Sequence, residues 1–106
     1  MVRIVFEGAG GGATAIDAVP GVSLMQNAKD CDVPGIEAEC GGSMVCGTCQ
    51  VYVPEPWYSA LGGPSPMEAE MLAFTAHPRA GGRLSCQIEV TAALAGMTVA
   101  TPPSQR

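Results

Sequence analysis

Four of the five cysteines in this 106-residue chain have a spacing that suits a metal centre. Cys40, Cys46 and Cys49 lie in one short stretch, and Cys86 follows far down the chain in an apolar segment. Four thiolates are the ligand set of an iron–sulfur cluster or of a structural zinc ion. Zinc sites usually combine two Cys-x-x-Cys hooks, and this chain has one such hook, Cys46 to Cys49. The spacing therefore favours an iron–sulfur cluster over zinc.

Glycines accompany these cysteines at Gly41, Gly42 and Gly47. A cluster of two irons, two sulfides and four thiolates is an anion, so a buried one needs hydrogen-bond donors. Glycine lets the backbone turn its N–H groups toward sulfur and lets the chain pass close to the cluster. A plain tight turn is the alternative interpretation, and the cysteine spacing makes it the weaker one.

Three segments together carry a family resemblance: Cys40–Gly42, Cys46–Cys49 and Arg83–Gln87. They resemble the 2Fe-2S ferredoxins of the adrenodoxin and putidaredoxin type. The resemblance implies an α+β domain of the β-grasp fold, with a mixed sheet, one crossing helix and a cluster-binding loop. It also implies one 2Fe-2S cluster, held by Cys40, Cys46, Cys49 and Cys86. Further similar segments are 22–25, 33–36, 68–72 and 96–99.

Composition limits the domain count, the partners and the compartment. The apolar fraction of 47% suffices for the core of one domain, which we expect to span residues 1–106 with a flexible tail from about residue 101. The net charge of −5 argues against nucleic acid or an anionic membrane as a partner. An odd cysteine count, with no expected signal peptide or membrane span, suits a reducing compartment. We expect a monomer in the bacterial cytoplasm.

Hydrophobic periodicity predicts two regular segments at the start of the chain. Residues 2–6 and 14–19 alternate as the strands of a hairpin with a glycine-rich turn. Ser23 and Gln26 fit a capping box for a helix from Leu24 to about Cys31. The helical spacing predicts that Cys31 packs in the core and binds no metal.

The rest of the chain alternates between short strands and helices. Residues 54–64 are expected to form an irregular connection, with Trp57 and Tyr58 as a hydrophobic plug beneath it. Ser65 and Glu68 fit a second capping box, for a helix ending near Phe74 on which Met67, Met71 and Phe74 form one stripe. The other expected elements are strands at 50–53, 83–90 and 97–100, and a short turn or helix at 91–95.

Residues suited to catalysis are scarce in this sequence. His77 is the single histidine, and no nearby side chain suggests a partner for acid–base work. The glycines at 8–12 fall in a hairpin turn with no helix behind them, so they do not match a dinucleotide-binding fingerprint. We therefore expect an electron-transfer protein and not an enzyme.

The resemblance implies the partners of such a carrier. A FAD-containing ferredoxin reductase, using NADH or NADPH, would supply one electron, and a monooxygenase of the cytochrome P-450 class would receive it. Alternatives are a Rieske-type oxygenase as acceptor or, ranked third, a role in iron–sulfur cluster assembly. A zinc-stabilised binding module is an alternative of a different class.

Acidic residues near the cluster loop and on the second helix suggest a docking surface, which we predict to comprise Glu39, Met67, Glu68 and Glu70. The chain also departs from the family pattern. Gln50 stands where a histidine usually follows the third cysteine, and Arg106 stands in place of a C-terminal aromatic residue. Pro66, Met67 and Ala73 occupy positions that are acidic in adrenodoxin-like proteins, so an electrostatic docking face would be reduced here.

Overall fold

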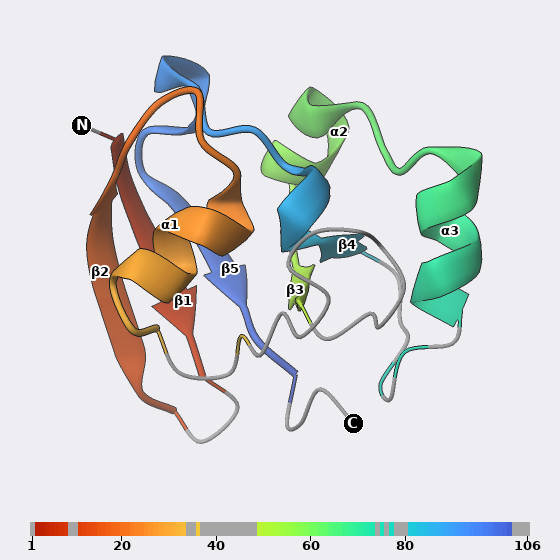
Figure 1. The fold of residues 1–106 in the computed structure, drawn as a ribbon, viewed down its shortest axis with the longest axis horizontal. Coiled ribbons are helices and arrows are strands. Elements are labelled where there is room, and N and C mark those ends of the chain that lie inside the picture. Colours follow the sequence, from red (N-terminus) through yellow and green to blue (C-terminus); the bar gives the residue numbers. More distant parts are fainter. Residues whose placement is uncertain are drawn as a thin grey trace.

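The computed structural model describes residues 2–8, 11–33, 36, 49–73, 75, 77 and 81–102. Within these residues, the strands form one five-stranded mixed sheet in the order β2-β1-β5-β3-β4 (Figure 1). The strands are β1 (Val2–Glu7), β2 (Ala13–Ala18), β3 (Gln50–Tyr52), β4 (Gly82–Leu84) and β5 (Met97–Ala100).

The first two strands form the predicted hairpin. Val2, Ile4 and Phe6 are buried in alternation with more exposed residues, as a sheet with one covered face requires. In the antiparallel register, Val2 pairs with Ala18 and Ile4 with Ile16. The alternating pattern thus places one face of the hairpin in the core.

The last strand, β5, joins the two halves of the sheet. It pairs in parallel with β1 and contacts β3 through the antiparallel pair Tyr52–Ala100. Thr101 continues from it and donates its N–H to the Glu7 carbonyl at 2.8 Å. Thr101 and Pro102, at the start of the predicted flexible tail, are both buried, and residues 103–106 lie outside the described part of the chain.

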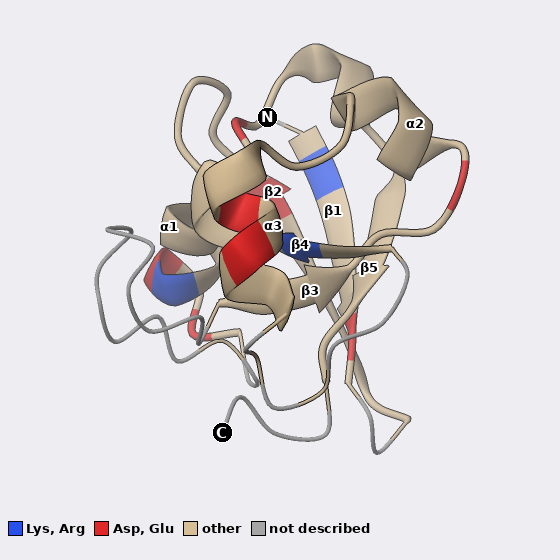
Figure 2. Cartoon of the chain, turned by 90° about the vertical axis from the view of Figure 1, so that its right-hand side faces the viewer, with Lys and Arg blue, Asp and Glu red and all other residues tan. Residues whose placement is uncertain are grey.

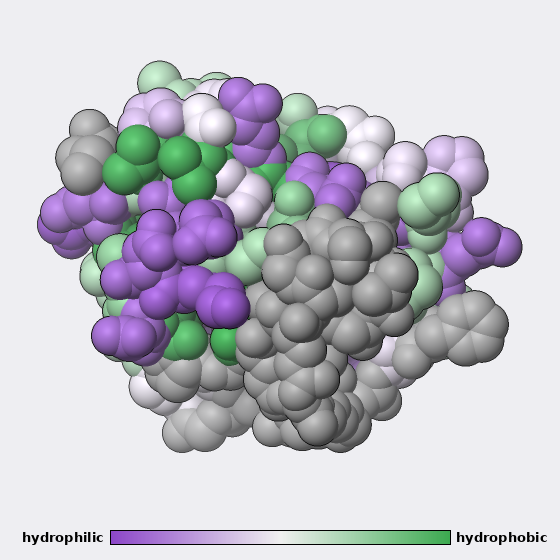
Figure 3. All heavy atoms as spheres, viewed as in Figure 1, coloured by the Kyte–Doolittle hydropathy of each residue, from purple (hydrophilic) through white to green (hydrophobic). Residues whose placement is uncertain are grey.

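Helix α1 (Leu24–Asp30) lies across one face of the sheet, in front of β1 and β5 in Figure 1. The Ser23 hydroxyl accepts a hydrogen bond from the Gln26 N–H at 3.1 Å, which confirms the predicted N-cap. The Gln26 side chain binds Asp30 instead of completing the capping box. Leu24 and Ala28 are buried, whereas the outer face of α1 is hydrophilic (Figure 3).

Cys31 does not pack in the core as predicted. The helix ends at Asp30, and Cys31 is its C-cap with φ −102° and ψ 9°. Because the helical spacing stops one residue earlier, the Cys31 side chain leaves the buried stripe and is exposed.

Residues 57–61 are helical, although an irregular connection was predicted there. Helix α2 (Trp57–Leu61) follows Pro56 and ends at Gly62, which has a left-handed φ of 83°. Trp57 and Tyr58 are partly buried against the main core, as the predicted plug requires.

Helix α3 (Pro66–Ala73) packs beside β4 and begins as predicted (Figure 1). The Ser65 hydroxyl accepts the Glu68 N–H at 3.2 Å. Of the predicted stripe, Met71 is half-buried, Met67 is 60% exposed, and Phe74 lies outside the described residues. Glu68 is instead the buried residue of this helix.

The segment after β4 is not the continuous strand predicted for residues 83–90. Strand β4 ends at Leu84, and a 3-10 helix, η1, follows at Ser85–Gln87. A second 3-10 helix, η2 (Ala92–Leu94), precedes β5 as expected from the sequence. The mixed sheet and its helices confirm the α+β class. None of the helices in the described ranges is long and apolar enough to cross a membrane.

Candidate metal centre

Cys49 and Cys86 meet because the strands beside them pair. Cys49 comes directly before β3, and Cys86 lies in η1 just after β4. The antiparallel register pairs Gln50 with Leu84, so the start of β3 lies beside the end of β4. The Ser85 N–H donates to the Cys49 carbonyl at 2.9 Å and extends this pairing by one residue. Two cysteines far apart in sequence therefore become neighbours.

A small apolar cluster surrounds this thiol pair, Cys49 and Cys86. Cys49 is 1% exposed and packs with Met25 of α1 and Leu84 of β4. Cys86 is half-buried at its edge. The other partly buried members are Ile36, Met71 and Leu72. The inner side of the pair is thus shielded by α1, β4 and α3.

The two thiols influence each other directly. A hydrogen bond with the Cys86 side chain, followed by burial, raises the pKa of the Cys49 thiol above its usual range. A hydrogen bond from the Cys86 backbone acts in the opposite direction and lowers this pKa. A backbone donor suited to a thiolate is therefore already in place beside Cys49.

This donor set fits a bound metal. A metal ion deprotonates the thiols that it binds, and its charge offsets the burial of the resulting thiolates. Hydrogen-bond donors to ligand sulfurs are a feature of iron–sulfur sites. Cys49 and Cys86 are thus suited to hold a cluster. Cys40 and Cys46, the other two predicted ligands, lie outside the described residues, as do Gly41, Gly42 and Gly47.

Glu68 does not belong to an exposed docking surface, so the prediction is wrong for this residue. It is 1% exposed, and its carboxylate accepts hydrogen bonds from Arg83 Nε at 2.7 Å and Nη2 at 3.1 Å. The Leu84 N–H donates to the same carboxylate at 2.9 Å. Figure 2 shows the acidic positions of α3 in red beside the basic position of β4 in blue. The charge of Glu68 is therefore neutralised inside the protein.

Two of the other three predicted docking residues are exposed, and the third lies outside the described residues. Met67 and Glu70 are exposed on α3. Glu39 lies outside the described residues. Met67 and Glu70 therefore remain a predicted docking pair.

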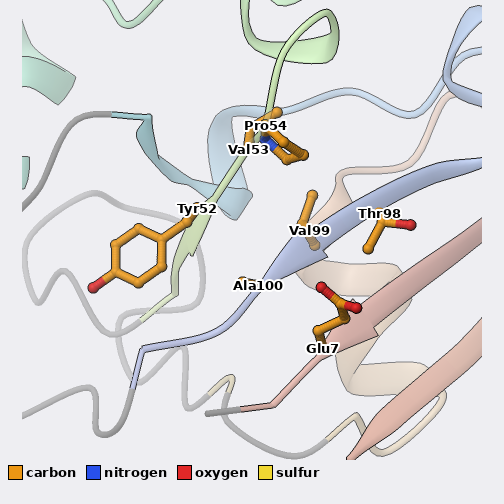
Figure 4. Close-up of a pocket in the computed structure, with 7 residues that line it drawn as sticks. All are labelled: Glu7, Tyr52, Val53, Pro54, Thr98, Val99 and Ala100. Carbon is orange, nitrogen blue, oxygen red and sulfur yellow. The ribbon is translucent and has the colours of Figure 1, made fainter. Parts of the chain in front are cut away.

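A separate pocket of about 300 Å³ opens where β3 and β5 diverge (Figure 4). Glu7 supplies the one charged side chain among its lining residues, and none of these is a cysteine. The lining residues are Glu7, Tyr52, Val53, Pro54, Thr98, Val99 and Ala100. The pocket is thus distinct from the thiol pair.

Ser85 is a site residue that sequence reasoning missed. It is fully buried, and its hydroxyl donates to the Cys49 carbonyl at 2.7 Å. Its position next to Cys86 was the available signal, but the acceptor is a backbone group and leaves no trace in the sequence. Gln50, which replaces the usual histidine, is also buried.

Comparison with known proteins identifies the family. The model of the 2Fe-2S iron-sulfur cluster binding domain matches residues 10–91. Ferredoxin CarAc of a Sphingomonas species is 46% identical over 98% of this chain and 95% of its own length. Terpredoxin of a Pseudomonas species is 43% identical over 96% of this chain and 97% of its own.

Solved structures agree with these sequence relatives. A crystal structure of a reduced putidaredoxin variant from Pseudomonas putida matches with a TM-score of 0.94 and 34% identity, over 98% of this chain and 99% of that one. Putidaredoxin in its covalent complex with putidaredoxin reductase matches with a TM-score of 0.89 and 38% identity, over 94% and 97% of the two chains. The matches confirm the predicted β-grasp fold. The chain belongs to the 2Fe-2S ferredoxin family and is an electron carrier with one 2Fe-2S cluster, not an enzyme.

Proposed function

We propose that this ferredoxin carries single electrons from a FAD-containing, NAD(P)H-dependent ferredoxin reductase to a monooxygenase of the cytochrome P-450 class. The observation that carries this proposal is its similarity to terpredoxin and putidaredoxin over nearly the full length of each chain. The match to putidaredoxin in a complex with its reductase supports the donor. The Cys-Gly-Gly motif at 40–42 resembles that of ferredoxins serving P-450 enzymes, which supports the acceptor.

Cys40, Cys46, Cys49 and Cys86 are the proposed cluster ligands. The contact between the Cys49 and Cys86 thiols supports two of the four. When bound, the cluster supplies reversible one-electron chemistry. The protein supplies the surroundings: Met25 and Leu84 shield the inner side from water, and the Cys86 backbone provides a hydrogen-bond donor.

Docking on α3 would bring a partner close to this site. The helix packs beside β4, which leads directly into Cys86, and it exposes Met67 and Glu70. An apolar side chain beside a carboxylate suits a partner surface with a basic rim and an apolar centre. We propose this face for the reductase and the oxygenase in turn, with the ferredoxin acting as a monomer in the bacterial cytoplasm.

Reconstituted electron transfer tests the proposal. The purified holoprotein is mixed with a ferredoxin reductase, NADH or NADPH, and either a P-450 monooxygenase or a Rieske-type oxygenase. Reduction of the P-450 haem, followed by its carbon monoxide difference spectrum, is the expected result. Turnover of the Rieske-type oxygenase alone would overturn the assigned acceptor, whereas a colourless zinc-containing protein would overturn the cofactor assignment.

A further inference from the structure

Ser85 directly precedes Cys86 and makes two hydrogen bonds to Cys49, the other cysteine of the thiol pair. Its N–H and its hydroxyl both donate to the Cys49 carbonyl, at 2.9 Å and 2.7 Å. The side chain is fully buried. The serine therefore connects the backbone of Cys49 to the residue next to Cys86.

The two hydrogen bonds differ in what they require from the sequence. The N–H bond extends the pairing of β3 and β4, and any residue except proline would form it. The hydroxyl bond needs a serine or threonine side chain, and its 2.7 Å length is typical of a good O–H···O contact. Of the two hydrogen bonds, only the one from the hydroxyl therefore depends on which residue occupies position 85.

Neighbouring contacts hold the rest of the segment. Leu84 donates its N–H to the Glu68 carboxylate at 2.9 Å. The Ile88 carbonyl accepts the N–H of Leu24, at the start of α1, at 2.7 Å. These contacts attach both ends of the segment to α3 and α1, so the Ser85 hydroxyl acts on a segment that is already folded.

We propose that Ser85 is a positioning residue of the cluster site: its hydroxyl fixes the Cys49 carbonyl and thereby the relative orientation of the Cys49 and Cys86 thiols. This inference rests on the proposed ligation by these two cysteines. Groups that orient metal ligands influence both metal retention and electronic properties. Reduction potentials of iron–sulfur sites respond to hydrogen bonding and solvent exposure near the sulfurs. Ser85 should therefore affect the potential and the rate of cluster loss.

Replacing Ser85 with alanine removes this bond selectively. The Cys49 carbonyl keeps the N–H of residue 85 as a donor, so no buried acceptor is left without a partner. The void equals one oxygen atom, and the contacts of Leu84 and Ile88 remain. We expect the Ser85→Ala protein to fold and to bind a cluster.

Thr101 provides a matched control. It is 5% exposed, and its N–H at 2.8 Å and its hydroxyl at 3.4 Å both donate to the carbonyl of Glu7. Thr101→Val therefore removes a buried hydroxyl contact from the same kind of acceptor, although this contact is longer than that of Ser85. An effect on the cluster that is seen in Ser85→Ala and not in Thr101→Val would therefore come from the position of Ser85 beside the thiol pair.

The experiment compares the wild-type, Ser85→Ala, Ser85→Thr and Thr101→Val holoproteins. The readouts are the electron paramagnetic resonance spectrum of the reduced protein, the reduction potential, and the loss of visible absorbance in the presence of a chelator. For Ser85→Ala we expect changed g-values, a shifted potential and cluster loss about three- to ten-fold faster, the range that corresponds to one hydrogen bond. Ser85→Thr, which keeps the hydroxyl, should restore the wild-type potential, and Thr101→Val should match wild type throughout.

Two results would overturn the inference: a Ser85→Ala protein identical to wild type, or equal changes in Thr101→Val. If Ser85→Ala purifies without iron, denaturation of the apoproteins decides. A loss of apoprotein stability no larger than one hydrogen bond accounts for supports positioning, and a larger loss contradicts it. Iron content of Cys49→Ser is measured in parallel. Retention of a normal cluster there would refute the proposed ligation, whereas cluster loss there with an unaltered Ser85→Ala would refute the positioning role alone.

Discussion

Glu68 and Arg83 form a buried ion pair that joins α3 to β4. Arg83 Nε lies 2.7 Å from Glu68 Oε2, and the two side chains are 6% and 2% exposed, respectively. The Leu84 N–H adds a third donor to the same carboxylate. Since Cys86 follows Leu84 by two residues, the pair anchors the helix proposed for docking to the segment that carries a proposed ligand.

Replacing Glu68 with alanine should strongly destabilise the protein. The Arg83 guanidinium would stay buried without its counter-charge, and its Nη1 already has no hydrogen-bond partner among the described residues. Breaking one side of a buried pair typically costs about 3–5 kcal/mol. Denaturant unfolding of the apoprotein measures this loss.

An exposed ion pair supplies the control for this prediction. Arg3 and Asp17 lie 3.2 Å apart with side chains 64% and 60% exposed. Solvent screening limits such pairs to about 1 kcal/mol or less, so Asp17→Ala should change stability only slightly. Equal losses in Glu68→Ala and Asp17→Ala would contradict a structural role for the buried pair.

Serine substitutions test the ligand assignment. Changing Cys40, Cys46, Cys49 or Cys86 to serine should abolish or alter the cluster, because each removes one thiolate. Cys31→Ser should keep full iron and sulfide content, since Cys31 is exposed at the end of α1. Iron analysis and the electron spin signal of the reduced protein provide the measurement. A normal spectrum for Cys86→Ser, or a lost cluster in Cys31→Ser, is incompatible with the assignment.

Removal of the cluster should lower thermal stability. Metal binding contributes to folding free energy when the ligands come together only in the folded chain. Cys49 and Cys86 do so through the pairing of β3 with β4, which spans three residue pairs. We expect a clearly lower unfolding midpoint for the apoprotein by circular dichroism. Equal midpoints with and without iron would contradict this coupling.

Docking should depend on both Glu70 and Met67. Glu70→Gln should slow electron transfer from the reductase at low ionic strength, because charges at an interface rim mainly steer association. Met67→Ala should slow it at every salt concentration, since the 60% exposed side chain would lose an apolar contact. Stopped-flow reduction across a salt series separates the two effects.

Glu7→Gln is the matched control for docking. Glu7 is an exposed acid on β1, which β5 and β3 separate from β4 and its neighbour α3. The Glu7→Gln substitution should leave the rate of electron transfer from the reductase and its salt dependence nearly unchanged. A response of Glu7→Gln as large as that of Glu70→Gln would mean that net charge, and not the α3 face, governs the encounter.

Much of the fold was predictable because local patterns agree with the tertiary structure. The alternation in residues 2–6 predicted the buried face of the hairpin, and Ser23 predicted the start of α1. Helix α2 was missed because the prolines at 54 and 56 suggested an irregular segment. Proline is tolerated at the first turn of a helix, and here Pro56 stands directly before it.

The candidate site was predictable only where a motif marks it. The cysteine spacing predicted that Cys49 and Cys86 belong to one centre. Glu68 was misassigned because the acidic residues of this helix suggested a docking surface, whereas Arg83, a residue distant in sequence, determines where its carboxylate points. The partner of Ser85 is a backbone carbonyl, so no residue type at position 49 would have indicated it.

The order of the strands has a consequence for biosynthesis. Strand β5 is the last strand of the described chain, yet it occupies the centre of the sheet between β1 and β3. A chain emerging from the ribosome can form the β1–β2 hairpin early, but its two halves stay unjoined until residues 97–100 have been made. Met25 of α1, which follows that hairpin in the chain, packs with Cys49. The thiols of Cys49 and Cys86 therefore reach their final setting late, and we expect cluster delivery to act on a nearly finished polypeptide and not on a nascent one.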